Sequence, residues 1–229
     1  MRRVAELTAN LAVLEQRVTA ACAAAGRDRA EMTVVAVSKT WPASDVAMLR
    51  DLGLRDFGEN RDGEAGEKAA AVAGVRWHFV GAVQTNKARS VSSYADVVHS
   101  LDRPALVTAL SNGAQRAGRT VDVLIQVSLD AAPGRGGARP AEVPALAELA
   151  AAAQGLRLAG VMAVAPLGAD PAEAFGRLAE VAEAVRRRHP DAQVLSAGMS
   201  GDLEAAVAAG ANVLRVGTAL FGHRPPLLR

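Results

Sequence analysis

The sequence predicts a single-domain α/β fold, a (β/α)8 barrel of the TIM type preceded by an extra N-terminal helix. Apolar runs typical of buried strands alternate with amphipathic segments, and eight such strands can be counted. The 229 residues suit one barrel, and no linker-like stretch divides residues 1–229. Repeated βα units imply parallel strands joined by right-handed crossovers. Eight of them favour a closed barrel over an open doubly wound sheet, which usually has about six strands.

The extra helix is expected over residues 4–25. Apolar side chains recur there at steps of three and four residues, as on one face of a helix: Val4, Leu7, Leu11, Leu14, Val18 and Cys22. Gly26 is a suitable residue to end this helix. The next run, residues 32–38, is short and rich in β-branched residues, which is typical of a strand buried on both faces.

Strands and helices are then expected to alternate. The further strands are predicted at 54–58, 76–82, 96–101, 121–129, 157–164, 193–198 and 212–217. The helices between them are predicted at about 44–52, 61–73, 86–93, 104–118, 140–153, 171–189 and 202–209. Residues suited to cap these helices are Ser44, Asp102 and Ser200 with Asp202.

Composition and charge exclude several classes of protein. Hydrophobic residues make up 50% and charged residues 22%, which excludes disorder, and a net charge of +2 is too weak to indicate a nucleic-acid partner. The N-terminus has no uninterrupted apolar core, and no apolar run approaches the ~18 residues of a membrane span. We therefore expect a cytoplasmic protein. The single cysteine, Cys22, excludes a disulfide framework, and no His/Asp/Glu set has metal-ligand spacing.

Polar residues gather where the predicted strands end, which is where barrel enzymes place their sites. Lys39 is the most informative, because the chain has only three lysines among 26 cations and this one follows an almost wholly apolar strand. Its ammonium group is expected in the mouth of the barrel, where desolvation would make the amine a nucleophile suited to a Schiff base. The alternative is a strand-end lysine that simply reaches water.

The ends of the seventh and eighth strands indicate a phosphate site. Ser200 is expected to begin a helix, so that its hydroxyl and the next amides would face an anion, and the turn at Gly217 and Thr218 could add amides. Loops at these two places are the usual phosphate site of such barrels, although helix capping and a tight turn would also explain them. Arg215 could point into the barrel toward a ring nitrogen or a second anion, or pair with a core carboxylate such as Glu59.

A nucleophilic lysine facing a phosphate site suggests pyridoxal 5′-phosphate, which carries an aldehyde and a phosphate. Six groups of residues then resemble the pyridoxal phosphate homeostasis protein family, in order from about residue 30 to 222. They are VSKT (37–40), FGEN (57–60), WHFVG (77–81) with QTNK (84–87), HSLD (99–102), LSAGMS (195–200) and RVGTALFG (215–222). That family is similar to the N-terminal barrel of alanine racemase.

The resemblance implies a role for each site residue. Lys39 would carry the Schiff base, and Arg215 would face the pyridine nitrogen. The phosphate would be held by Ser200, Gly217 and Thr218, and the set of cofactor-binding residues is completed by Asn60 and Met199. A charged guanidinium leaves the ring nitrogen unprotonated and the cofactor a poor electron sink. The resemblance therefore implies a protein that buffers the cofactor or delivers it to client enzymes in transient contacts. We expect a monomer, because the dimerisation domain of the racemases is not found in this sequence.

The chain departs from the family pattern at several places. Ala82 and Val83 stand where His-Leu is usual, Ser128 where Asn is usual, Arg135 in place of a lysine and Ala197 in place of a common methionine. None of these touches the residues expected at the Schiff base or the phosphate. They leave open a secondary lysine site, and Lys87 could be a docking or transfer lysine on the rim or could cap a short helix.

Two enzymatic functions are the alternatives. Racemases that resemble this barrel carry a second, β-rich domain that supplies a tyrosine base. This chain ends seven residues after Gly222, and its single tyrosine, Tyr94, is expected on the wrong side of the barrel, so we expect no appreciable racemase activity. A Schiff-base aldolase would need an acid or base beside Lys39, and only Glu59 or Asp102 could serve. His99 and Asp102 could form an acid–base pair, whereas His78 is expected to be a hydrogen-bonded packing residue.

Overall fold

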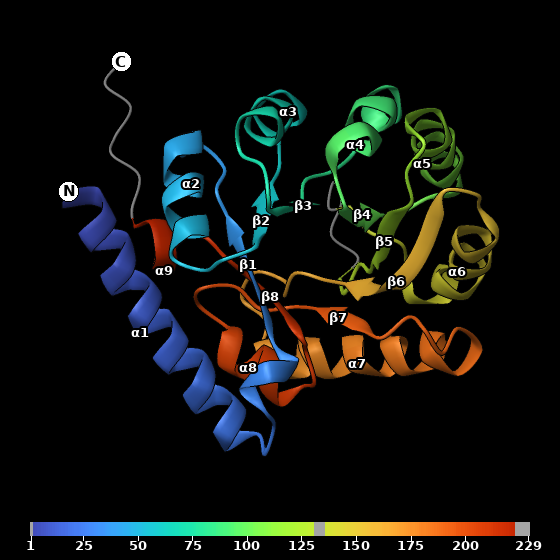
Figure 1. Cartoon of the computed structure of the whole chain (residues 1–229). Helices are drawn as coiled ribbons and strands as arrows, with labels where there is room; N and C mark the ends of the chain where they lie inside the picture. The colour runs from blue at the N-terminus through green and yellow to red at the C-terminus, as the bar shows by residue number, and fades with distance from the viewer. Residues whose placement is uncertain (1, 131–135, 223–229) are drawn as a thin grey trace.

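Eight parallel strands hydrogen-bond in chain order and close into a barrel, since the last strand pairs with the first (Figure 1). This is the arrangement in a computed structural model that describes residues 2–130 and 136–222. The strands are β1 (Thr33–Val37), β2 (Asp56–Glu59), β3 (Arg76–Phe79), β4 (Val97–Leu101), β5 (Val121–Gln126), β6 (Leu156–Met162), β7 (Val194–Ser196) and β8 (Val213–Val216). The predicted fold class is confirmed.

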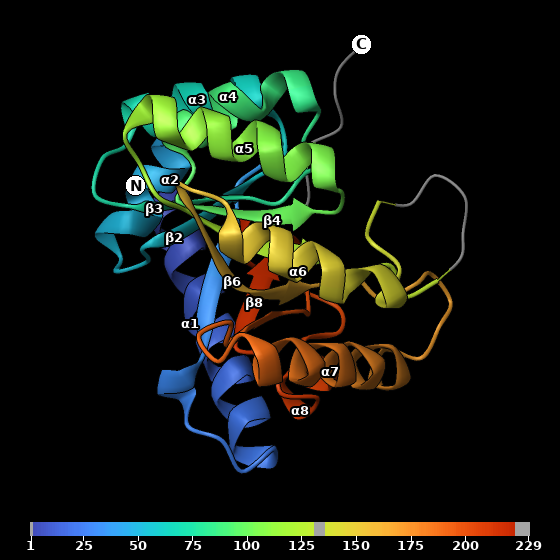
Figure 2. The same ribbon diagram turned by 90° about the vertical axis from the view of Figure 1, so that its right-hand side faces the viewer.

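Helices surround the strands in both views (Figures 1 and 2). They are α1 (Arg2–Ala24), α2 (Ala43–Asp51), α3 (Asp62–Ala71), α4 (Ala88–Tyr94), α5 (Pro104–Ala117), α6 (Val143–Ala152), α7 (Pro171–Arg188), α8 (Leu203–Ala208) and α9 (Thr218–Phe221). Short 3-10 turns lie at Arg29–Glu31, Thr85–Lys87 and Pro140–Glu142. Within the described ranges, no helix has the length and hydropathy needed to cross a membrane.

Every predicted strand and helix is present, and Gly26 has the left-handed φ of 66° expected of a residue that ends a helix. The strand predicted over 121–129 ends at Gln126. Beyond it, Val127 still donates to the carbonyl oxygen of Met162 at 2.8 Å but forms only an isolated bridge with the loop residue Ala138. The four-residue helix α9 was not predicted.

Of the predicted helix caps, Asp202 stands at the N-cap position of α8 without a side-chain capping bond, whereas Ser44, Asp102 and Ser200 cap no helix. The helices α2 and α5 begin after Pro42 and Arg103, neither of which makes a side-chain capping bond. Ser44 lies inside α2, and Asp102 forms an ion pair with Arg103 instead of capping α5. At these helix ends the backbone continues directly out of the loop that follows a strand. The position of that loop in the fold, and not a capping side chain, therefore decides where the helix begins.

Two apolar regions hold the barrel together. The larger lies between the strands and the helices and contains the most completely buried large side chains, among them Phe57, Phe175 and Leu178. The smaller lies inside the barrel and consists of Val97, Leu124, Ala159 and Met162, with Val194 packed against it. These few apolar side chains cannot fill a barrel. Much of the remaining interior is therefore polar, and this polar part leads to the site.

The extra helix α1 packs across the place where β8 meets β1. Arg3, in its first turn, donates to Asp45 at 2.7 Å and to the carbonyl oxygen of Phe221 at 3.0 Å. Its guanidinium also lies over the ring of Trp41, 4.4 Å from the ring centroid, and Trp41 stacks on Phe221 with centroids 5.9 Å apart. The helix thus ties the loop after β1 to α9, the two segments that border the candidate site.

Candidate functional site

Lys39 lies at the carboxyl end of β1, on the face of that strand that lines the barrel. A Cβ atom at Gly58 would lie 3.1 Å from Val35 and 3.2 Å from Val37, and one at Gly217 would lie 3.8 Å from Val37, so these side chains share the barrel interior. Lys39 is the next residue in this alternation and lies in the turn that follows the strand. The residue is exposed, so the predicted desolvation of its ammonium is wrong for this structure. Within the described chain its amine has no hydrogen-bond or ion-pair partner.

A buried ion pair holds the strand end that presents Lys39. Ser38 is fully buried, and its hydroxyl donates to Oε1 of Glu59 at 2.6 Å. Lys68, which comes from α3 and is only 7% exposed, donates to the carbonyl oxygen of Ser38 at 2.9 Å and forms an ion pair with Glu59. Residues from the ends of β1 and β2 and from α3 therefore meet at Ser38, the residue before Lys39. Their bonds restrict the direction in which the Lys39 side chain leaves the barrel wall.

The residue after Lys39 has an unusual backbone. Thr40 has a φ of 70°, which is rare for a β-branched residue and costs about 1–3 kcal/mol. Its N–H group donates to Oε2 of Glu64 at 3.1 Å. Burial raises the pKa of the Glu64 carboxyl, but the hydrogen bonds from Thr40 and Arg61 and the charge of Lys68 outweigh it and lower that pKa. The carboxylate is thus kept ionised and able to hold the strained turn.

Arg215 places a buried positive charge inside the mouth. It belongs to β8, where its register partner on β1 is Val35, and it is 5% exposed. It donates to the Ser196 hydroxyl at 2.6 Å and to the carbonyl oxygen of Ala163 at 2.9 Å. Burial lowers its pKa to about 10, and the more distant charge of Asp202 opposes this effect, so the group is still charged at neutral pH.

No carboxylate of the described residues lies within ion-pair distance of Arg215. The alternative pairing with Glu59 is wrong, because Glu59 is paired with Lys68. The N–H groups of Arg215 that do not bind Ser196 or Ala163 have no acceptor in the part of the chain that the structure describes. A buried cation of this kind needs an acceptor, and the mouth of the barrel is where one can arrive.

The loops after β7 and β8 meet, as the prediction of an anion site requires. The Ser200 hydroxyl accepts a hydrogen bond from the N–H of Ala219 at 3.2 Å, which joins the two loops. The helix predicted to start at Ser200 starts at Leu203, however, and has only six residues, so the argument from a helix N-terminus is wrong. What these loops offer instead are the N–H groups of Ser200 and Gly201, which donate to nothing within residues 2–130 and 136–222.

The other predicted binding residues lie at the same end of the barrel. Asn60 directly follows β2, and the chain after β3 passes so close that a Cβ atom at Gly81 would lie 2.3 Å from the Asn60 carbonyl oxygen. Met199 is 38% exposed, and its N–H donates to Asp202 at 2.6 Å. Thr218 is exposed and begins α9. The structure thus gathers all seven predicted residues on the ends of β1, β2, β7 and β8.

Sequence reasoning misassigned His99 and did not identify its partners. The Nε2 atom of His99 lies 2.8 Å from Nδ1 of His78, and its Nδ1 atom lies 3.1 Å from the Ser196 hydroxyl. The pairing of His99 with Asp102 is therefore wrong. His78 is hydrogen-bonded and buried, as predicted. A signal was present, because both histidines stand in apolar strands at positions that alternate into the barrel, but their mutual contact depends on the shear of the closed sheet.

Lys87 and Tyr94 both bond to the carboxylate of Asp62. Lys87 forms an ion pair with Asp62 of α3, with Nζ and Oδ2 3.7 Å apart, and makes no side-chain capping bond to α4. Tyr94 donates to the same carboxylate at 3.2 Å, and burial, followed by the charge of Asp62, raises the pKa of its hydroxyl. Tyr94 is thus part of the outer helix layer. Of the family departures, Ser128 donates to the carbonyl oxygen of Asp130 at 2.6 Å, and Arg135 lies outside the described residues.

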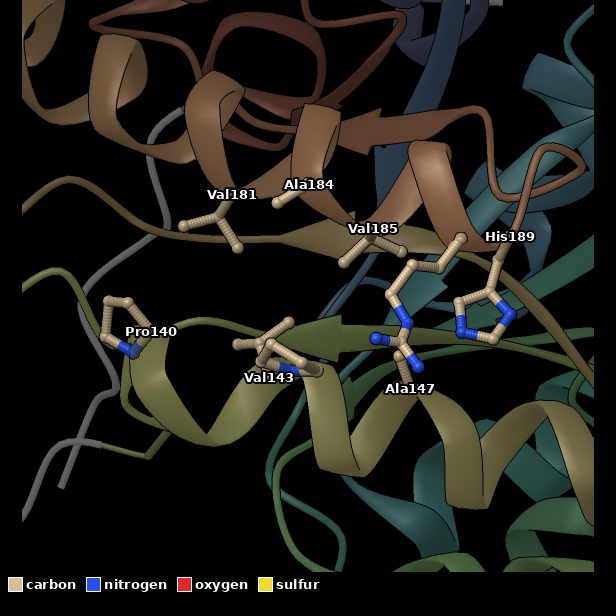
Figure 3. A pocket seen from close by; sticks show the side chains of 9 residues that line it. Pro140, Val143, Ala147, Val181, Ala184, Val185 and His189 are labelled. Carbon is tan, nitrogen blue, oxygen red and sulfur yellow. The ribbon is translucent and has the colours of Figure 1, made fainter.

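An apolar pocket between α6 and α7 is separate from this site (Figure 3). Its walls come mainly from Pro140, Val143, Ala147, Val181 and Val185. None of the predicted site residues borders it, and it has only Arg188 and His189 as polar lining side chains. The Arg188 guanidinium is paired with Glu148 at 2.8 Å, and the lining offers no amine for an aldehyde.

Comparison with known proteins supports one family. The family model described as alanine racemase, N-terminal domain, matches residues 5–225. The pyridoxal phosphate homeostasis protein of Mycobacterium tuberculosis is 42% identical over an alignment of 243 positions, gaps included, that covers 97% of this chain and 94% of that protein. PipY of Synechococcus elongatus, solved with PLP bound, is 36% identical and covers 84% of this chain and 93% of its own, with a TM-score of 0.74. Alanine racemase from Corynebacterium glutamicum shares the fold, with a TM-score of 0.73 at 15% identity, over 99% of this chain and 62% of that enzyme.

The buried pair of Glu59 and Lys68 should contribute strongly to stability. Lys68→Met removes the ammonium and leaves the buried Glu59 carboxylate without a compensating charge, which should lower the free energy of unfolding by about 3–5 kcal/mol. Lys87→Met is the matched control, because its ion pair is largely exposed and should be worth less than about 1 kcal/mol. Urea denaturation measures both. Equal losses in the two variants would contradict the role given to the buried pair.

The two buried histidines should make stability depend on pH. The pKa of His78 and that of His99 are both lowered, above all because burial penalises the charged ring, and for His99 the neighbouring His78 and Arg215 add to the effect. In the unfolded chain both return to about 6.5, so below that pH unfolding takes up protons. The free energy of unfolding should therefore fall as the pH drops from about 7 to about 5.5, by up to ~1.4 kcal/mol per pH unit for each histidine.

Urea denaturation across this pH range measures the slope. The double variant His78→Gln with His99→Gln is the control, because it removes both titrating rings. A slope that stays unchanged in the double variant would show that other groups cause it.

Proposed function

The chain belongs to the alanine racemase N-terminal domain family and, within it, to the pyridoxal phosphate homeostasis proteins, and from this we propose that it binds pyridoxal 5′-phosphate reversibly. Lys39 holds the aldehyde carbon as a Schiff base, and Arg215 donates to the pyridine nitrogen. The protein stores this cofactor or delivers it to client enzymes and does not turn over a substrate of its own. The relatives' names and the PLP bound to PipY support the proposal.

The observation that carries the proposal is that two cations, Lys39 and Arg215, lie at the same end of the barrel and are suited to bind different groups. Lys39 offers an exposed amine that no other group of the described chain engages, as a carbonyl-binding residue must. Arg215 offers a buried guanidinium that no carboxylate neutralises, as a residue that donates to a neutral ring acceptor must. The amides of Ser200 and Gly201 provide donors for a phosphate. The residues present therefore fit the three functional groups of the cofactor.

The remaining predicted residues complete the proposed site. Ser200, Gly217 and Thr218 hold the phosphate through hydroxyl and amide groups, and a glycine at 217 allows the phosphate to approach the backbone. Asn60 and Met199 border the ring. A single domain, a monomeric state and a cytoplasmic location stay predictions, as do transient contacts with client enzymes.

Arg215 also explains why turnover is not expected. A pyridoxal enzyme that works at the Cα of an amino acid depends on the ring as an electron sink, and a protonated ring nitrogen makes the sink strong. A charged guanidinium can only donate, so it needs the ring nitrogen as an acceptor and keeps it unprotonated. Cα chemistry is thereby disfavoured.

The second candidate function, a racemase-like activity, is favoured by the fold shared with alanine racemase. Racemisation needs a proton carrier on each face of Cα. The single tyrosine of the sequence is bound to Asp62 in the outer helix layer, and its raised pKa opposes ionisation. Tyr94 is thus not placed to serve as the second base.

Covalent attachment tests the proposed function. After incubation with pyridoxal 5′-phosphate, the protein should absorb visible light, and borohydride reduction should leave the pyridoxyl mass on the peptide that contains Lys39. Lys39→Ala should abolish both signals, because no other amine is placed in the mouth. Lys87→Ala is the control and should behave like the unchanged protein, since Lys87 is held by Asp62. A label that stays in Lys39→Ala, or that lies on Lys87 or Lys68, would overturn the assignment.

Turnover separates the two candidate functions. With cofactor bound, incubation with L-alanine should produce no D-alanine above the rate of free cofactor, because no second base and no strong electron sink are available. Chiral chromatography after long incubation measures the product. Formation of D-alanine that depends on Lys39 would establish the racemase-like function instead.

A further inference from the structure

A row of hydrogen-bonded polar side chains crosses the inside of the barrel and ends at Arg215. It begins at Asp56, whose Oδ1 atom lies 2.9 Å from Nε2 of His78. It continues from Nδ1 of His78 to Nε2 of His99 over 2.8 Å, and from Nδ1 of His99 to the Ser196 hydroxyl over 3.1 Å. The last link is the 2.6 Å bond that Arg215 donates to the same hydroxyl. Five strands, β2, β3, β4, β7 and β8, thus contribute one residue each.

The row is shielded from water over most of its length. His99 and Ser196 are fully buried, His78 is 4% exposed, and only Asp56 is half-buried. Beside it lies the small apolar cluster of the barrel interior, around Val97 and Leu124. In such surroundings each donor needs an acceptor from within the row, because an unpaired polar group costs about 1–3 kcal/mol.

The chemistry of the two ends dictates the direction of every bond. The Asp56 carboxylate only accepts, so Nε2 of His78 carries a proton. A neutral His78 then accepts at Nδ1, which requires the proton of His99 on Nε2. His99 accepts in turn at Nδ1, so the Ser196 hydroxyl donates to it and uses its oxygen to accept from Arg215, which can only donate.

All bonds therefore run one way, from the guanidinium to the carboxylate. The charged groups that face the two rings are Asp56, Arg76, Asp96 and Arg215, and their combined effect with burial keeps both rings neutral. Aligned hydrogen bonds polarise one another, so the distant carboxylate favours the buried guanidinium without touching it. A carboxylate in direct contact would instead occupy the N–H groups that the mouth needs.

We propose that Asp56, His78, His99 and Ser196 form a one-way hydrogen-bond relay that positions the Arg215 guanidinium for the acceptor atom of the ligand. The four residues are positioning residues, since none of them is proposed to touch the ligand. The relay itself is a property of the ligand-free protein. Only its use toward a pyridine nitrogen rests on the proposed function.

The protonation pattern tests the relay without any cofactor. Nitrogen-15 NMR of the imidazole rings in the ligand-free protein should show His78 and His99 both neutral and both protonated on Nε2 at about pH 7, with assignments from His78→Gln and His99→Gln. A proton on Nδ1 of either ring, or a doubly protonated ring, would overturn the one-way relay. This result does not depend on whether pyridoxal 5′-phosphate binds.

Variants at the two ends test the positioning role. Ser196→Ala removes one of the two acceptors of Arg215, leaving the Ala163 carbonyl oxygen, and removes the donor to His99. The Nε2-only pattern of His99 should be lost, and the Kd for pyridoxal 5′-phosphate should rise about tenfold. Ser100→Ala is the matched control, because Ser100 is equally buried and its hydroxyl has no partner among the described residues. Ser196→Thr keeps the hydroxyl and should restore the histidine pattern.

Asp56→Ala removes the far end of the row at a half-buried position, which guards against failure to fold. It should change the tautomer signal of His78 and raise the same Kd about threefold, although Asp56 lies at the opposite end of its strand from the mouth. An unchanged Kd in both Ser196→Ala and Asp56→Ala, with the unchanged protein binding normally, would overturn the positioning role. If the unchanged protein does not bind the cofactor, the proposed function fails, while the NMR pattern still decides the relay.

Discussion

The pairing of β1 with β8 is the constraint on which the site depends. Four consecutive register pairs, from Thr33 with Val213 to Ala36 with Val216, close the barrel. This closure places Lys39 and Arg215, which are 176 positions apart in the chain, at the same end of two paired strands. It also sets the strand face on which each lies, because a slip of one residue would turn Arg215 out toward the helices. The helix α1 strengthens the same seam through Arg3, which contacts both sides of it.

Two buried cations near this seam are stabilised in different ways. Lys68 is neutralised directly by Glu59, and the pair is used to hold the strand end before Lys39. Arg215 has no such partner among the described residues and relies on hydrogen bonds that lead to a remote carboxylate. A direct ion pair makes a rigid structural support, whereas a cation stabilised from a distance keeps donors free for a ligand. The two arrangements thus separate the support of the site from its binding function.

Whether a prediction agrees with the structure depends on how far apart in the sequence the interacting residues lie. Strands, helices and the ends of strands that hold Lys39 and Asn60 were predictable, because periodicity and the order of βα units are properties of neighbouring residues. The helix start at Ser200 was wrong, because the Ser200 hydroxyl accepts from Ala219 of α9 instead of capping its own helix. The partners of Glu59 and His99 were wrong for the same reason. The sequence suggested Arg215 for Glu59 and Asp102 for His99. In the structure, Glu59 pairs with Lys68 of α3, and His99 bonds to His78 and Ser196 on other strands.

By itself, the sequence determined the barrel, the order of its strands and the edge on which the polar residues gather, since these follow from local patterns of apolar and polar residues and from the handedness of βα units. Only the tertiary structure decided which polar groups neutralise one another inside the barrel: Glu59 with Lys68, and Arg215 through Ser196 and two histidines to Asp56. The physical reason is that hydrogen bonds and ion pairs act over about 3 Å, and the shear of a closed sheet brings residues within that distance irrespective of their separation along the chain.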